Sequence, residues 1–143
     1  MRLRTRLRNE NGQAIVEFAL VLPLLMGLLL GIVQFGIIFN NYETITDAAR
    51  VGGRQAMVAR FSGDNGASAI AAAKSSASNL DLSAPGAVTV HSCPPATPNC
   101  TTDDWSMTGN IVTTTVTYPY AIKILDWTIK AGNLTSSSKE RLE

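Results

Sequence analysis

The feature that most constrains this chain is a run of 22 residues without charge, from Phe18 to Phe39. As a helix rising about 1.5 Å per residue, the run is about 33 Å long, enough to cross the roughly 30 Å apolar core of a bilayer. We therefore expect a membrane span. Glu17 directly precedes the run. Because a carboxylate in hydrocarbon costs roughly 2.5–3.5 kcal/mol, we expect Glu17 to have a role.

The charges on either side of the run predict its orientation. Before Gly12 there are four arginines, at positions 2, 4, 6 and 8, against the single acid Glu10, and no Lys or Arg follows the run before Arg50. The positive-inside rule therefore places the N-terminus in the cytoplasm and the C-terminal part outside the cytoplasmic membrane. From Gln13 onward, the chain has eight basic and ten acidic residues, and the basic residues form no stripe. A nucleic-acid partner is therefore not expected.

Two simpler interpretations of the apolar run are available. A secretory signal peptide has a basic start and an apolar stretch, but that stretch usually has about 7–15 residues and ends in a small-residue cleavage site. The run here is longer, and "IIFNNYETIT" after it offers no such site. An uncleaved membrane anchor remains open, although it explains neither Gly12 nor Glu17.

The stretch "GQAIVEF" resembles the processing site of type IV pilin-like proteins, with a basic leader that ends in Gly12. The longer segment "GQAIVEFALVLPLLMGLLLGIVQFG", followed by "AARVGGRQA", resembles the TadE-like pseudopilins of the Tad, or Flp, pilus system. The resemblance covers residues 10–60 and continues weakly in "TVTYPY" and the closing "LTSSSKERLE". It implies a cut between Gly12 and Gln13 by a prepilin peptidase, after which Glu17 is the fifth residue.

The same resemblance implies a role in assembly for Glu17 and Phe18. With Gln13 and Glu17 at i and i+4, a new amine on Gln13 can offset the carboxylate in low dielectric. The implied partners are the peptidase, other pilin subunits, the Tad inner-membrane assembly platform and membrane lipid, without a small-molecule substrate. Within the span, Pro23 predicts a kink, and Gly27 and Gly31 form a GxxxG face that permits close helix packing.

The remaining patterns predict an α+β fold of the pilin type. We expect a leader at 1–12, a transmembrane helix at 13–40, a helical extension and a second short helix at 41–80, and a small β-rich domain at 81–143. In the extension, Tyr42, Ile45, Ala49, Gly52 and Ala56 recur at helical spacing and form a face of mostly small side chains, with a bend or break plausible at the double glycine.

Strand signals dominate the C-terminal third. The stretch "AVTVHS" predicts a short strand, and the β-branched "NIVTTTVTYPY" predicts the central strand of an antiparallel sheet, ended by Pro119. The next segment, "AIKILDWTIKAGN", fits a loop, a short helix or a hairpin limb. The closing residues fit an edge strand or a loose tail.

Cys93 and Cys100, with six residues between them, are expected to form a structural disulfide, because the predicted compartment is oxidising. Their spacing does not fit a zinc or CxxC redox motif. His91 is the single histidine, and no GxSxG, HExxH or phosphate-binding glycine loop accompanies it. We therefore expect no enzyme activity, no metal and no cofactor.

Two function classes follow from these patterns. The first is a minor pilin or pseudopilin needed for assembly or initiation of a Tad-type pilus, in adhesion, surface attachment or biofilm formation. The alternative is an uncleaved single-pass envelope protein with a binding role. A secreted enzyme ranks last because the sequence shows no constellation for catalysis.

Overall fold

The computed structural model describes residues 10–59, 63–95, 103–106, 108–124 and 127–142. Its elements are helix α1 (Glu10–Ala59), helix α2 (Ala67–Ser76) and strands β1 (Val88–Cys93), β2 (Ile111–Ile124) and β3 (Trp127–Arg141). The expected α+β class is confirmed. The chain divides into two compact units, one up to Gly36 and one from Ile37 onward. Residues 1–9 of the predicted leader at 1–12 lie outside the described residues, and the predicted domain limits stay predictions.

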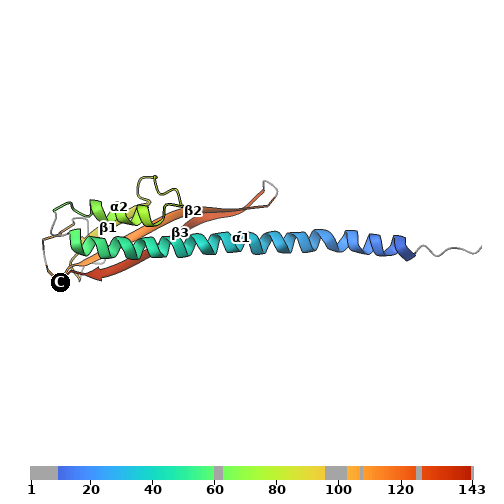
Figure 1. The fold of residues 1–143 in the computed structure, drawn as a ribbon, viewed down its shortest axis with the longest axis horizontal. Coiled ribbons are helices and arrows are strands. Elements are labelled where there is room, and N and C mark those ends of the chain that lie inside the picture. The colour runs from blue at the N-terminus through green and yellow to red at the C-terminus, as the bar shows by residue number, and fades with distance from the viewer. Residues whose placement is uncertain (1–9, 60–62, 96–102, 107, 125–126, 143) are drawn as a thin grey trace, which may run out of the picture. The chain divides into compact units, whose positions relative to one another are not determined.

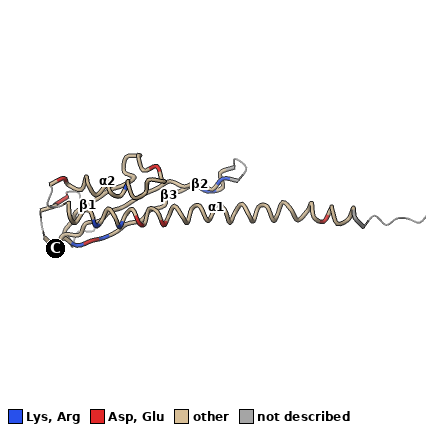
Figure 2. The backbone as a smooth tube through the Cα atoms, in the orientation of Figure 1, with Lys and Arg blue, Asp and Glu red and all other residues tan. Residues whose placement is uncertain are grey.

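In the first unit, α1 exposes its apolar side chains on all sides. Large side chains from Ile15 to Phe35 are 38–77% exposed. Figure 2 shows a long stretch of α1 without charge, and in the sequence Glu17 directly precedes the uncharged run. By length and composition, α1 is the one helix in the described part of the chain that could cross a membrane. Pro23 lies within this helix, which continues past it without a break.

The second unit packs its two helices on one face of the sheet. Ile45 and Ala49 of α1, Ala73 of α2 and Ala77 directly after α2 form a core with Val88 of β1 and Val116 of β2. A second cluster joins Ala56 and Ala69 to Val90, Val112 and Leu142. The predicted small-residue face of the helical extension is therefore buried, except for Tyr42, which is 44% exposed. Small side chains let these helices approach the sheet closely.

The double glycine does not break the helix, because α1 continues to Ala59. A Cβ on Gly52 would lie 2.8 Å from Thr114 Cγ2 and 3.1 Å from Ala73 Cβ, so the glycine is needed for close packing. The nearest atoms to a Cβ on Gly53 would be side-chain atoms of Glu140 and Ser138, at 3.2–3.5 Å. Tertiary packing thus outweighs the weak helix propensity of glycine.

The sheet has the order β1-β2-β3, with both pairs antiparallel. The expected central strand is confirmed as β2, and the segment after it forms a hairpin with β3, which is an edge strand (Figure 1). The expectation that Pro119 ends the ladder is wrong, because Pro119 pairs with Asn133 and β2 continues to Ile124.

The pairing of β2 explains why Pro119 is tolerated. The Thr117 N–H donates toward Ala87 on the β1 side, and in an antiparallel ladder every second residue points to the same side. Pro119 therefore faces the edge of β2 that β1 does not reach, since β1 pairs only with Ile111 to Val116. A missing N–H on an open edge removes no ladder hydrogen bond.

Helix α2 is shorter than expected, because it ends at Ser76 rather than near Leu80. The hydroxyls of Ser75 and Ser76 donate to the carbonyl oxygens of Ala72 and Ala73, at 2.9 and 3.0 Å. Serine hydroxyls that bond to the preceding turn offer the backbone an alternative to further helix. The chain then turns through Asp81, which places Leu82 in the core.

The Asp81 turn gives the fold a pH dependence. The Ser83 hydroxyl and backbone N–H donate to Asp81 Oδ1 at 2.6 and 3.0 Å, and these bonds lower the pKa of Asp81 from its ordinary value of 3.8. A lowered folded-state pKa contributes stability above the unfolded pKa, and that stability is lost as the pH falls through the folded value.

We expect Asp81→Asn to lower the melting temperature slightly at pH 7, with the difference from wild type disappearing below about pH 3.8. Asparagine keeps an acceptor oxygen but loses the charge that strengthens the two bonds. Melting curves followed by circular dichroism from pH 2.5 to 7 measure this difference. A gap that stays constant over the whole range would contradict the assignment.

Candidate processing and assembly site

The predicted processing site lies in the first turns of α1. The Gln13 amide Nε2 donates a hydrogen bond to Glu17 Oε1 at 3.0 Å, and both side chains are exposed. The expected i, i+4 proximity of these two residues is therefore present. Phe18 is 61% exposed beside them. The site thus presents a carboxylate, an amide and an aromatic ring on the open surface of one helix.

Gly12 and Gln13, on either side of the predicted cut, are both helical. Helix α1 already begins at Glu10, so the bond between Gly12 and Gln13 lies within its first turn. A peptidase that binds its substrate extended must therefore open this turn. Because the first four N–H groups of a helix have no acceptor within it, the first turn is the least costly part to open.

The residue at which α1 starts also determines how strongly the helix dipole acts on the Glu17 carboxylate. With α1 starting at Glu10, Glu17 is the eighth helical residue, beyond the first turn. The favourable interaction of a carboxylate with the helix dipole falls off within that turn. A chain that begins at Gln13 would bring Glu17 to within one turn of the new end. Processing would thus give the carboxylate both a nearby amine and the positive end of the helix.

The residues predicted for helix packing follow along the same exposed surface. No heavy atom lies within 4 Å of a Cβ placed on Gly27 or Gly31, apart from the helix's own backbone and chain neighbours. The GxxxG face is therefore open to another helix, and its role in packing stays a prediction. Pro23, one turn earlier, lies among exposed leucines.

The predicted disulfide is only partly within the described structure. Cys93 is the last residue of β1 and half-buried, and the described part of the chain has no free cysteine. Cys100 lies outside the described residues. The bond between Cys93 and Cys100 stays a prediction.

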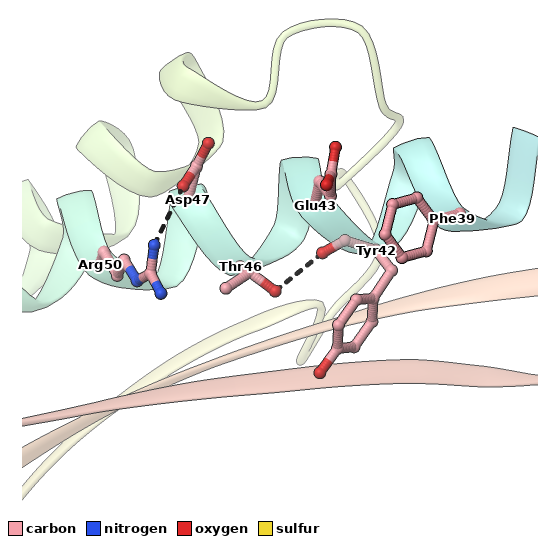
Figure 3. A pocket seen from close by; sticks show the side chains of 6 residues that line it. All are labelled: Phe39, Tyr42, Glu43, Thr46, Asp47 and Arg50. Carbon is pink, nitrogen blue, oxygen red and sulfur yellow. Dashed lines mark hydrogen bonds and ion pairs between the residues drawn. The ribbon is translucent and has the colours of Figure 1, made fainter. Parts of the chain in front are cut away.

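A groove on the outer half of α1 was not predicted from the sequence. Six residues line about 440 Å³ along one stripe of the helix, namely Phe39, Tyr42, Glu43, Thr46, Asp47 and Arg50. Arg50 Nη1 lies 3.6 Å from Asp47 Oδ1, and the Thr46 hydroxyl donates to the Tyr42 carbonyl at 2.8 Å (Figure 3). The aromatic rings and charges together form a mixed surface of the kind found at protein contacts.

The described part of the chain offers few side chains that could bind a metal ion together. No group of three or more His, Cys, Asp or Glu residues there could hold a metal ion. His91 Nδ1 lies 3.1 Å from Asp103 Oδ1, as an exposed pair beside β1. The absence of catalysis and of a cofactor stays a prediction.

Residues 12–54 match a family model described as TadE-like protein. The predicted resemblance to TadE-like proteins is thereby confirmed over these residues. The match begins at Gly12, the residue before the predicted cut, and does not include the strands of the C-terminal part. No curated protein matches the chain. No solved structure matches it either.

Proposed function

From the TadE-like match over residues 12–54, we propose that this chain is a minor pilin or pseudopilin of a Tad-type pilus. It is made as a membrane-held precursor with its N-terminus in the cytoplasm. A prepilin peptidase cuts it between Gly12 and Gln13. The processed chain then enters the fibre or helps to start it.

The observation that carries the proposal is the position of the match on α1. It starts at the glycine of the proposed cut, and the next residue, Gln13, contacts Glu17 one turn further along α1 at 3.0 Å. An uncleaved anchor requires neither the glycine nor a carboxylate at the edge of an apolar helix. A processed pilin requires both, because the glycine accommodates the peptidase and the carboxylate orders the subunits.

The proposed mechanism of assembly begins with the new amine on Gln13. In a helix bundle that excludes water, an unpaired carboxylate is costly, and a nearby ammonium group offsets that cost. The amine of one subunit and Glu17 of its neighbour would therefore set the axial position of each chain. The exposed apolar surface of α1 and the Gly27–Gly31 face would supply the packing area.

The second unit would then be carried outside the membrane. Its sheet keeps one face half-exposed and rich in hydroxyl side chains, namely Thr89, Thr113, Thr115, Thr117, Thr135 and Ser137. We assign to this unit the contacts with other pilins, with the Tad inner-membrane platform or with an adhesion target. Its size supports a minor rather than a major role, because a major Flp subunit is expected to be much shorter and nearly all helix.

N-terminal sequencing of the chain from its native membrane and sheared-pilus fractions tests the proposal. We expect the chain to begin at Gln13. We expect a Gly12→Val variant to keep its leader, because the added side chain obstructs the peptidase, whereas Gly36→Val, which adds the same bulk in the helix away from the cut, is processed normally. A chain that begins at Met1 or Arg2 would instead support the uncleaved envelope protein.

A further inference from the structure

In the second unit, the outer side of α1 carries four charged residues, with the two acids before the two bases. At about 100° per residue, Glu43, Asp47, Arg50 and Arg54 lie within about 60° of one another, on the side of the helix opposite the buried Ile45. All four are exposed. We call these four residues the charged stripe.

Within one chain, this order of charges is unfavourable. Residues four apart on a helix are neighbours, and like charges at that spacing destabilise it, whereas an acid followed by a base stabilises it. Here Asp47 follows Glu43 at that spacing, and Arg54 follows Arg50. The helix dipole does not compensate, because it acts within the terminal turns and no base lies in the last turn of α1.

The charges of the stripe gain little from one another. Among the described residues, its ion pair is Asp47–Arg50, at 3.6 Å and with side chains 75% and 63% exposed. Exposed pairs of this kind contribute little to stability. Neither Glu43 nor Arg54 forms an ion pair with another described residue. The chain itself therefore gains almost nothing from placing its charges in this order.

The stripe is part of a surface with the composition of a protein contact. Three of its residues line the groove of about 440 Å³ together with Phe39 and Tyr42, whose rings are 53% and 44% exposed. Figure 3 shows Glu43 and Asp47 projecting from the same side of α1. Phe, Tyr and Arg are enriched at protein interfaces, and the side chains of one helix pack into the grooves of another.

A second copy of the chain does not fit this surface in one membrane. In a closed dimer, two copies that cross a membrane in the same direction are related by a two-fold axis along the membrane normal, which places each residue level with its counterpart. Glu43 and Asp47 would then face acids, and Arg50 and Arg54 would face bases. Like charges across a contact are costly, so the stripe disfavours its own copy.

We propose that the charged stripe binds a helix of a different membrane-anchored subunit, with bases level with Glu43 and Asp47 and acids level with Arg50 and Arg54. Each charge then meets its opposite, which also relieves the repulsion within each like-charged pair. The inference deepens the proposed function, because it rests on the membrane span and its orientation, and it does not depend on processing at Gly12.

A charge-inverted copy of the full chain has the partner chemistry and serves as the probe. It carries Glu43→Arg, Asp47→Arg, Arg50→Glu and Arg54→Glu, so its net charge equals that of wild type. Both chains are produced together in the membrane of a host without pili. In one of them, photoreactive benzoylphenylalanine replaces Val58, which is 64% exposed and one turn beyond Arg54. We expect at least about tenfold more mixed dimer than wild-type dimer, because four like pairs become four opposite pairs.

A chain with only Glu43→Arg and Arg54→Glu is the graded control. Its net charge is also unchanged, but two of its pairs with wild type are opposite and two are like, so its yield should be intermediate. The single change Glu43→Ala leaves three of the four pairs and should weaken the contact only slightly. Circular dichroism checks that each variant folds.

If the inverted chain does not fold, two simpler variants test the same contact. An all-acidic stripe (Arg50→Glu, Arg54→Glu) and an all-basic one (Glu43→Arg, Asp47→Arg) should crosslink to each other and not to themselves. Folded variants that crosslink no better than wild type would overturn the proposal, as would wild type that crosslinks equally well to itself. Gly12→Val chains keep the stripe, so their crosslinks should persist when processing fails, and N-terminal sequencing reports processing separately.

Discussion

Replacing Glu17 with alanine will reduce the amount of this chain in sheared fibres at least about tenfold, while its amount in the membrane is unchanged. In the assembled helices, removing one partner of a buried charge pair typically costs about 3–5 kcal/mol, and each 1.4 kcal/mol is about a factor of ten in an equilibrium. Insertion is not impaired, because alanine at this position removes a charge from the edge of the apolar helix. Quantitative blotting of sheared and membrane fractions measures both amounts.

The matched control is Glu43→Ala, which removes another exposed carboxylate of α1 from the outer unit. If the effect at Glu17 were a general loss of helix charge, both variants would behave alike. The proposal expects a large loss at Glu17 and a much smaller one at Glu43. Normal incorporation of the Glu17→Ala chain would refute the assembly mechanism and leave the carboxylate without a role.

The order in which these effects occur also separates processing from assembly. The carboxylate lies after the predicted cut, in a helix that continues past it on both sides. We therefore expect the Glu17→Ala chain still to begin at Gln13, whereas Gly12→Val prevents the cut itself. Two variants five residues apart thus block two successive steps, and N-terminal sequencing shows which step each one blocks.

The helical part of the fold could be predicted from local patterns. An uncharged run of 22 residues and the spacing of Ile45, Ala49 and Ala56 specify a long helix with a buried outer face, and the structure has both. The processing site was predicted from the resemblance to TadE-like proteins, in which the glycine, glutamate and phenylalanine lie within seven residues, and it stays a prediction. Their proximity follows from helix geometry alone.

The parts that the sequence did not predict depend on neighbours far along the chain. Pro119 stays in its strand because β1 is too short to reach it, and nothing near Pro119 in the sequence indicates that length. The groove at Tyr42 and Arg50 is a different case, because its six lining residues are ordinary surface residues on one stripe of a helix, and no residue type among them marks a contact.

Gly52 and Gly53 allow a sharp test of how α1 packs in the second unit. Gly52→Ala will destabilise this unit by about 1–3 kcal/mol, because the added methyl would lie 2.8 Å from Thr114 Cγ2 and overpack the core. That cost exceeds the gain of about 1 kcal/mol in helix propensity. A loss of about 1 kcal/mol lowers the melting temperature of a domain of this size by roughly 4–8 °C. Circular dichroism of the full chain in detergent measures it.

Gly53→Ala makes the same chemical change one residue later and should be close to neutral. Its methyl meets the Glu140 and Ser138 side chains at 3.2–3.5 Å, and the Glu140 chain can rotate away, so the gain in helix propensity offsets the contact. A difference between the two variants therefore reports the close approach of α1 to β2 and α2. If both glycines tolerate alanine equally, α1 does not pack against Thr114 as the structure has it.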